Sequence, residues 1–556
     1  MNILLSAPVL SIAETKAWEA SLLKDEAAAW AAMQRAGAAL AHAVAEDFRE
    51  IGGLPANARL LVLAGKGNNG GDALLAAAEI LRRYPQAQAD VVMCFAETLL
   101  RPLAKRALDE LCGTGLLTRV RPVTAGQETQ AAKYDLCLDG IFGFQFRPPM
   151  DAATAEILAR VNAHPDIRLR AAVDLPSGLG ETNGGTVFRA DFTYATGIVK
   201  APVLAEANAA FVGRVRYLDL GFFKVERVDP NAPEAGQGVA GDRSGSPDGS
   251  TSLATPSRSK NPASGPVEPS SPDRILLPQI LRPLGQLRPA RSDKRTYGHL
   301  FVLGGSRNYP GAVLMTVRAA LRSGVGLLTA FVPESLVPEY AARFPEAMWV
   351  GLPQTLQGGI SGAGVPLLLE KLPRASALVI GPGLGAEPET LAAVREIVRN
   401  RNISQGADDP KVPNKNIPLL LDADALRPEI VAEAAGQRIV CTPHAGEYAR
   451  IAGVLQPAEN TVLVRKGSPT HVSAGGANYY SLFGGPVLAR GGSGDLLAGL
   501  IGGLLAQKPD NLLLAAARGV VWHGFAADLL ARDQGQVAVQ TTQLLDYLQP
   551  ALHEAQ

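Results

Sequence analysis

Residues 65–73, GKGNNGGDA, follow the apolar run RLLVLA and combine four glycines with two asparagines and one acid. A glycine-rich turn from a strand into a helix exposes backbone N–H groups, which favours an anion. The segment matches neither the G-x-G-x-x-G fingerprint nor a P-loop, and a helix that starts at Asp72 would place a carboxylate against a bound phosphate. Taken alone, it is as consistent with a tight turn capped by Asp72 as with a ligand site.

Three more polar side chains favour a ligand site. Asp139 ends the apolar run YDLCLDG, and Asp174 and Ser177 follow another run in VDLPSG. Because ligands in parallel sheets bind beyond the carboxyl ends of the strands, Asn69, Asp139 and Ser177 are predicted to share one crevice. Their hard oxygen atoms carry a single formal charge, which suits a monovalent cation better than zinc or calcium.

A second ordered series of motifs occupies the other half of the chain: GGSRNYPGA (304–312), GPGLG (381–385), DADAL (422–426), TPHAGE (442–447), RKGSPT (465–470) and GGSGD (491–495). In GGSGD, glycines that open an apolar helix form an anion hole. Asp495 at its mouth can take a proton from a hydroxyl during phosphoryl transfer. His444 in TPHAGE, taken alone, is more often a satisfied loop histidine than a catalytic group.

Composition indicates a globular chain that handles a small ligand. Its 556 residues are 47% hydrophobic and carry 53 basic and 53 acidic side chains, so no net charge draws it to nucleic acid or to an anionic membrane. No apolar run approaches the roughly 20 residues of a membrane span. The four cysteines form no CxxC pair and are typical of buried thiols in a reducing compartment. We therefore expect a cytoplasmic protein.

The elements that position these motifs fall into two blocks. Residues 226–273 are rich in proline, glycine and serine, which predicts a flexible linker between domains at 1–225 and 274–556. A polar insert at 402–416 is predicted to be a surface loop. Both blocks alternate strand-like and helix-like segments, beginning with a helical stretch at 13–48, so each is predicted to be an α/β layer fold with a parallel sheet.

The motifs AGKGNNGGDA, DGIFG, VDLPSG, ADFTYATGIVK and GRVRYLDLG make residues 10–225 resemble the NAD(P)H-hydrate epimerase (YjeF N-terminal) family. The resemblance implies a Rossmann-like three-layer α/β/α fold that inverts C6 of a hydrated nicotinamide ring. It implies a potassium ion at Asn69, Asp139 and Ser177, and a catalytic, substrate-binding Asp174. The other substrate contacts it implies are Asn68, Asn69, Gly70, Gly71, Asp72, Gly143, Phe144, Gln145, Phe146, Arg147, Pro148 and Pro149. The family usually has a GTG-type loop where this chain reads GFQFRPP.

The second series makes residues 277–550 resemble the ADP/ATP-dependent NAD(P)H-hydrate dehydratases of the ribokinase-like superfamily, an α/β/α fold. The resemblance implies phosphorylation of the C6 hydroxyl with Asp495 as the catalytic base, followed by loss of phosphate. Magnesium would accompany the ADP or ATP. The implied hydrate contacts are Ala312, Gly383, His444 and Asp495, and the implied nucleotide contacts are Lys466, Gly467, Ser468, Pro469, Thr470 and Gly494. Where the family has a further helix between Glu447 and Lys466, this chain is short.

Together the two resemblances predict a bifunctional repair enzyme for the hydrates NADHX and NADPHX, of a kind that tends to self-associate into homo-oligomers. Two alternatives remain open. The C-terminal block could be a kinase for a small hydroxylated compound such as a vitamin precursor or sugar. The N-terminal block could be a binding module without catalysis.

Overall fold

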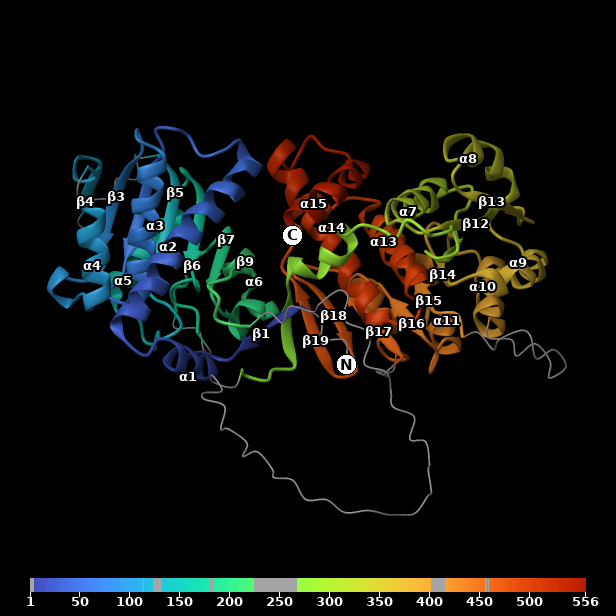
Figure 1. The fold of residues 1–556 in the computed structure, drawn as a ribbon, viewed down its shortest axis with the longest axis horizontal. Coiled ribbons are helices and arrows are strands. Elements are labelled where there is room, and N and C mark those ends of the chain that lie inside the picture. The colour runs from blue at the N-terminus through green and yellow to red at the C-terminus, as the bar shows by residue number, and fades with distance from the viewer. Residues whose placement is uncertain are drawn as a thin grey trace, which may run out of the picture.

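The computed structural model describes residues 5–113, 115–123, 133–180, 185–224, 268–401, 416–455, 458 and 460–556. Two α/β blocks lie side by side along the long axis of the molecule (Figure 1). Most of the predicted linker at 226–273 lies outside the described residues, although Asp273 already begins a strand. The predicted surface loop at 402–416 lies outside them except for Asn416.

The N-terminal block has a sheet of seven parallel strands in the order β4-β3-β2-β5-β6-β7-β9. The strands are β2 (Arg59–Ala64), β3 (Gln88–Met93), β4 (Val120–Val123), β5 (Tyr134–Gly140), β6 (Ile167–Val173), β7 (Phe192–Thr196) and β9 (Arg214–Leu218). Strand β2 alternates its side chains between two buried faces. Leu60 and Val62 belong to one apolar cluster, whereas Leu61 and Leu63 belong to another.

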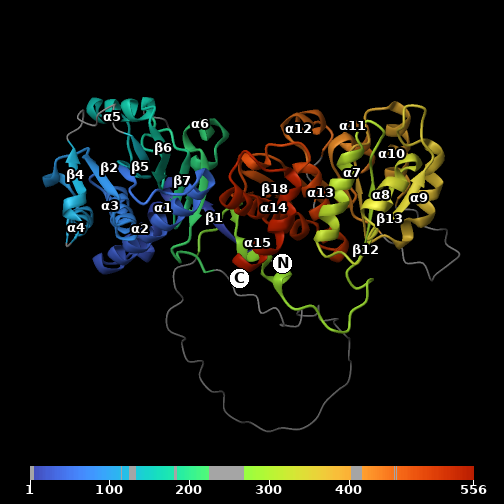
Figure 2. The ribbon, with the colours of Figure 1, turned by 90° about the horizontal axis from the view of Figure 1, so that it is seen from above.

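Helices cover both faces of this sheet. Helices α2 (Glu26–Phe48), α3 (Asn68–Arg83) and α4 (Pro102–Leu111) pack on one face, and α5 (Ala152–Ala163) packs on the other. Figure 2 shows α5 on the opposite side of the sheet from α2, α3 and α4. The predicted three-layer α/β/α arrangement is thus confirmed for this block.

The helical stretch predicted at 13–48 is confirmed as two helices, α1 (Ile12–Leu22) and α2, because the side chain of Asp25 accepts from Ala28 N and caps a new helix. One local prediction in the N-terminal block is wrong, because helix α3 begins at Asn68, after Gly67, and not at Asp72. Asp72 is therefore a buried side chain inside the helix and does not cap it.

The C-terminal block has a longer sheet whose parallel part runs β13-β12-β11-β14-β15-β16-β17, followed by the antiparallel hairpin β18-β19. The strands are β11 (His299–Leu303), β12 (Leu327–Pro333), β13 (Met348–Leu352), β14 (Ala377–Ile380), β15 (Leu419–Leu421), β16 (Ile439–Cys441), β17 (Thr461–Arg465), β18 (Thr470–Ala474) and β19 (Ala477–Ser481). Helices pack on both faces, which confirms the second α/β/α fold. One face carries α7 (Pro310–Arg322), α8 (Val337–Arg343), α13 (Ser493–Gln507), α14 (Leu512–Gln534) and α15 (Leu548–Glu554), and the other carries α9 (Val365–Lys371), α10 (Pro388–Asn400), α11 (Pro428–Glu433) and α12 (Ala445–Ile451).

Helix α14 corrects the expectation that no apolar run approaches the length of a membrane span. Its 23 residues are long and apolar enough to cross a bilayer, but 83% of its most apolar stretch is buried inside the protein. Such burial is typical of the core helix of a large α/β domain.

Three short strands that the sequence analysis did not predict join the two blocks. Strand β1 (Ser6–Leu10) pairs antiparallel with β10 (Asp273–Leu276) and parallel with β8 (Val199–Lys200). Strand β10 also pairs with β19, so the C-terminal sheet continues through β10 and β1 to β8 and reaches twelve strands. Figure 1 shows β1 between the two blocks.

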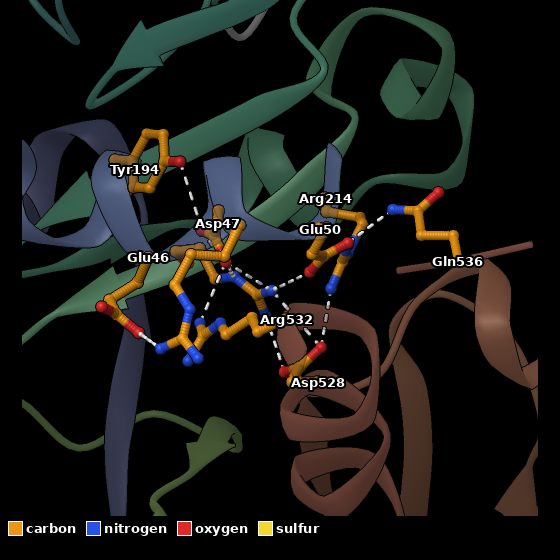
Figure 3. A network of polar contacts seen from close by, with 10 residues as sticks. Glu46, Asp47, Glu50, Tyr194, Arg214, Asp528, Arg532 and Gln536 are labelled. Atoms are coloured by element: carbon orange, nitrogen blue, oxygen red, sulfur yellow. Dashed lines mark hydrogen bonds and ion pairs between the residues drawn. The ribbon is translucent and has the colours of Figure 1, made fainter. Parts of the chain in front are cut away.

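A buried network of ion pairs crosses the same interface (Figure 3). Arg216 of β9 lies between Asp47 of α2, at 2.9 Å, and Asp528 of α14, at 2.8 Å. Arg532 of α14 also reaches Asp47 at 2.9 Å, and Arg214 reaches Asp528 at 2.6 Å. Burial alone would raise the pKa of Asp47, but Arg216 and Arg532 outweigh it and hold that pKa below its usual value.

Candidate active sites

The three predicted cation ligands lie together at the carboxyl ends of β5 and β6. Ser177 Oγ donates to Asp139 Oδ1 at 2.6 Å, and the Ser177 N–H donates to Asp139 Oδ2 at 2.8 Å. Asn69, in the first turn of α3, donates to the carbonyls of Phe142 at 3.0 Å and Val173 at 2.6 Å. These bonds use the amide nitrogen of Asn69 and leave its oxygen for another partner.

The chemistry of this set fits a cation. Asp139 is fully buried, and burial raises the pKa of its carboxyl to about 6 although hydrogen bonds from Ser177 oppose the shift. A bound cation would offset the cost of burying this negative charge. Carboxylate, hydroxyl and amide oxygens are ligands that hard cations prefer.

A cavity of about 340 Å³ opens beside this set. The predicted substrate contacts that line it are Asn68, Asn69, Gly143, Phe144, Gln145, Phe146, Arg147 and Pro149. Lys66, Phe95 and Arg101 line it as well and had not been predicted. The cavity therefore gathers two of the predicted segments around the N-terminus of α3.

Gly70 and Gly71 lie inside α3 and are buried, so neither lines this cavity. A Cβ atom at Gly70 would lie 2.1 Å from the carbonyl oxygen of Gly65, and one at Gly71 would lie 2.6 Å from Met33 Sδ. Both glycines are required for the close approach of α3 to its neighbours. Pro148, the remaining loop residue, is exposed and is not part of the lining.

A group of acids, two of them buried and Glu19 half-buried, lies around one buried lysine near the cavity. Asp174 has a φ of 69°, and its Oδ1 accepts from Thr196 Oγ1 at 3.1 Å and from Lys200 Nζ. Lys200 is completely buried. Burial and the charges of Asp174 and Glu19 raise the pKa of Asp72 well above its usual value. Burial also raises the pKa of Glu19 to about 7, against the attraction of Lys200.

Sequence reasoning missed Lys200 and Glu19. Lys200 ends the run ADFTYATGIVK, and a lysine that closes an apolar strand was the available signal. Glu19 gave no signal, because a glutamate side chain on a helix usually faces solvent.

In the C-terminal block, Lys466 is the centre of the predicted nucleotide site. Its Nζ atom lies 2.8 Å from Asp422 Oδ1 and 3.7 Å from Glu447 Oε2. A Cβ atom at Gly494 would lie 3.2 Å from the same nitrogen, so Gly494 lies directly beside Lys466. Asp422 was noticed in the DADAL motif but was given no role. The structure makes it the main partner of Lys466.

Asp495 lies in the first turn of α13, next to this lysine. Helix α13 follows Gly492, whose φ of 88° makes the turn into the helix. Burial first, and then the charge of Asp422, raise the pKa of Asp495 to about 7, while Lys466 opposes the shift. A carboxyl with this pKa accepts a proton near neutral pH, which is what a general base requires.

His444 caps a helix. Its Nδ1 accepts hydrogen bonds from the N–H groups of Gly446 at 3.0 Å and Glu447 at 3.4 Å, so this nitrogen carries no proton. The side chain is 60% exposed, which leaves the rest of the ring open to a ligand. The helix it caps, α12, occupies the start of the segment in which we expected the chain to be short.

The remaining predicted contacts lie at two turns. A Cβ atom at Gly383, which has a φ of 70°, would lie 3.1 Å from Ala312 Cβ, so these two residues are neighbours. Residues 466–469 connect β17 to β18, which begins at Thr470, and Thr470 Oγ1 donates to the Gly467 carbonyl at 3.1 Å. Among the described residues, no group of three His, Cys, Asp or Glu side chains is arranged to hold a metal ion.

Comparison with known proteins agrees with this organisation. A family model described as NAD(P)H-hydrate dehydratase matches residues 300–550, and one described as the YjeF-related protein N-terminus matches residues 30–201. The bifunctional NAD(P)H-hydrate repair enzyme Nnr of Gloeobacter violaceus is 33% identical and covers 99% of both chains. That of Escherichia coli is 30% identical, covering 88% of this chain and 84% of its own.

Among solved structures, an ADP/ATP-dependent NAD(P)H-hydrate dehydratase from Bacillus subtilis is 26% identical with a TM-score of 0.41, and it covers 51% of this chain and 98% of its own. The N-terminal block is a Rossmann-like α/β/α domain of the YjeF type, and the C-terminal block is a ribokinase-like α/β/α domain. With nearly full-length relatives at this identity, the chain belongs to the family of bifunctional NAD(P)H-hydrate repair enzymes.

Proposed function

We propose that this chain repairs hydrated NADH and NADPH in two steps. The N-terminal block, residues 1–225, interconverts the R and S epimers at C6. The C-terminal block, residues 274–556, dehydrates the S epimer with ADP or ATP and releases phosphate with AMP or ADP. The work would take place in the cytoplasm.

The observation that carries the dehydration step is the position of Asp495 beside Lys466 at the N-terminus of α13. Asp495 takes the proton of the C6 hydroxyl as that oxygen attacks the terminal phosphoryl group. The Lys466 ammonium and the N–H groups of α13 stabilise the negative charge on the phosphoryl oxygens. Loss of phosphate from C6 and of a proton from C5 then restores the double bond.

Two ions belong to this proposal. Magnesium would arrive with the nucleotide and neutralise its phosphates, as phosphoryl transfer normally requires. Potassium would be held by Asn69, Asp139 and Ser177 and would fix the turn that contains Phe142. The support for potassium is the buried, oxygen-rich geometry of those three side chains.

The test is incubation of the chain with a mixture of NADHX epimers and either nucleotide, followed by the near-ultraviolet absorbance of reduced cofactor. Full recovery of the mixture, with one phosphate released per molecule repaired, is the expected result. A phosphorylated organic product without free phosphate would identify a small-molecule kinase instead. Recovery of only the S fraction would mean that the N-terminal block is a binding module without catalysis.

A further inference from the structure

We propose that Lys200 and Asp174 together move the protons of the epimerisation, with Lys200 as the acid and Asp174 as the base. This inference rests on the proposed function of the N-terminal block. It adds Lys200, which had no predicted role, to the catalytic residues of that block.

The surroundings of Lys200 are those of a reactive group. Lys200 has no exposed surface, and Asp174 Oδ1 is its only hydrogen-bond acceptor among the described residues. An ammonium group has three N–H donors, so two are left without a protein acceptor in the described part of the chain. Burying unpaired donors is costly, and a ligand oxygen that accepts from them would offset that cost.

Phe144 connects Lys200 to the cavity. The Phe144 ring centroid lies 5.6 Å from Lys200 Nζ, and the same residue lines the 340 Å³ cavity. Lys200 therefore lies directly behind the wall that the predicted substrate loop provides. Phe144 is only half-buried, and the proposal requires its side chain to shift so that the ammonium reaches a ring held in the cavity.

Asp174 is suited to act with it. Its Oδ1 is taken by Lys200 and Thr196, whereas no donor in the described residues reaches its Oδ2. Its backbone has a φ of 69°, an uncommon conformation for a residue other than glycine and one that a fold retains where it serves a purpose. Burial first, and then the charge of Asp174, raise the pKa of nearby Asp72, whereas the ammonium of Lys200 donates to Asp174 and not to Asp72.

Lys200 and Asp174 together supply and recover every proton that the reaction requires. Lys200 gives a proton to the C6 hydroxyl, the C–O bond breaks, water leaves, and the ring nitrogen forms a double bond to C6. Water then adds to the opposite face, and Asp174 takes its proton as the electron pair returns to the nitrogen. The proton passes back to Lys200 through their hydrogen bond, so no oxidant, reductant or second substrate is consumed.

The decisive variants are Lys200→Met and Lys200→Arg in the full chain, with Lys224→Met, an exposed lysine of the same block, as a control. Without nucleotide, chromatography of NADHX epimers follows interconversion alone. With ADP and the S epimer, recovery of NADH reports dehydration in the same molecule. We expect Lys200→Met to slow interconversion by about 10²- to 10⁴-fold through kcat rather than KM. Dehydration should stay within twofold of wild type.

The Lys200→Arg variant distinguishes a catalytic role of Lys200 from a role as the counter-charge of Asp174. An arginine keeps the positive charge beside Asp174 but cannot release a proton near neutral pH. Lys200→Arg should therefore remain as slow as Lys200→Met. Restored interconversion in Lys200→Arg, or interconversion above half of wild type in Lys200→Met, would overturn the proposal and leave Lys200 as a structural counter-charge.

A measurement on the unmodified chain covers the case in which the variants fold poorly. The rate of interconversion in deuterium oxide should fall below the rate in water, because protons move in the slow step. Equal rates would contradict the proposal. If the unmodified chain does not interconvert the epimers at all, the proposed function of the N-terminal block fails, and with it the reaction to which this inference assigns Lys200.

Discussion

At the scale of single residues, each block holds a carboxyl group whose pKa is raised to about 7, Glu19 in one and Asp495 in the other. Burial is the largest cause in both cases. The two groups nevertheless have different expected consequences, because Asp495 lies beside Lys466 and is the proposed base of phosphoryl transfer, whereas Glu19 interacts with Lys200 from α1. Asp495 is expected to set the pH dependence of dehydration, and Glu19 is expected to contribute to the pH dependence of stability.

Asp495 must be ionised to accept the proton of the C6 hydroxyl. We expect kcat/KM for dehydration to fall as the pH drops below about 7, the pKa of this group in the free protein. Asp495→Asn should lower turnover by about 10²- to 10⁴-fold and abolish this acidic limb, while nucleotide binding persists through the backbone N–H groups. Nucleotide titration and a pH–rate profile check this. Near-normal turnover would point to His444 instead.

Glu19 has a higher pKa in the folded chain than its ordinary value of 4.5. The folded state therefore holds its proton more tightly, and the stability this provides is complete below about pH 4.5 and lost as the pH rises to about 7. Glu19→Gln mimics the protonated form. Its advantage over wild type in unfolding free energy should grow over this interval to no more than about 3 kcal/mol, reduced by the partial exposure of Glu19. Denaturant titrations at pH 4.5, 6 and 8 measure it, and a constant difference would contradict the assignment.

At the scale of elements, β1 supports the proposed proton pair. Leu10 of β1 is the register partner of Lys200 on β8, so the strand that holds the lysine is itself held by β1. Helix α1, which carries Glu19, follows β1 directly. Both elements precede residues 30–201, the part that matches the N-terminal family model.

Leu10→Ala should test this support. Leu10 is fully buried, and truncating such a side chain costs about 2–5 kcal/mol. Because Leu10 packs with Val199 and Leu175 of the N-terminal block, we expect epimer interconversion to lose heat resistance before dehydration does. The residual rates of epimer interconversion and of dehydration, measured after heating, test this order of inactivation. The exposed Leu287 provides a control, since Leu287→Ala should change stability by no more than about 0.5 kcal/mol.

These elements also mark the limit of sequence-based prediction. Strands such as β2 and β5 could be predicted because each is a continuous apolar run. The polar residues and glycines that follow such runs then led to the prediction of Asn69, Asp139 and Ser177 as a site. Strand β8 has two residues, and β1 finds its partner β10 across 268 positions in the chain. No local pattern encodes such a pairing. A local signal marked Lys200 as a lysine that closes an apolar run, but only the tertiary fold places it against Asp174.

At the scale of the whole molecule, the two blocks share both a sheet and a buried ion network, although their sequences predicted independent units. Arg216 carries this network, since its guanidinium contacts both Asp47 and Asp528. Arg216→Met would leave those two buried carboxylates with fewer partners, at a cost of about 3–5 kcal/mol. The exposed pair Arg343–Glu339 is the matched control, because Arg343→Met should cost no more than about 1 kcal/mol. Chemical denaturation measures the loss of unfolding free energy in both variants. Equal losses would contradict the claim that the buried network stabilises the interface.

The pairing of β1 with β10 also has a consequence for how the chain is made. Synthesis at about 5–20 residues per second places roughly 10–50 s between the appearance of Ser6 and that of its partner strand. Strand β8 is synthesised earlier than β10, so for the last part of that interval β1 can pair on one edge only, and its other edge has unsatisfied backbone groups until β10 appears. The N-terminal block therefore cannot finish folding while it is being synthesised. The pairing of β1 with β10 must wait until the first strand of the C-terminal block has been made. A chaperone that shields nascent chains would be expected to hold this segment.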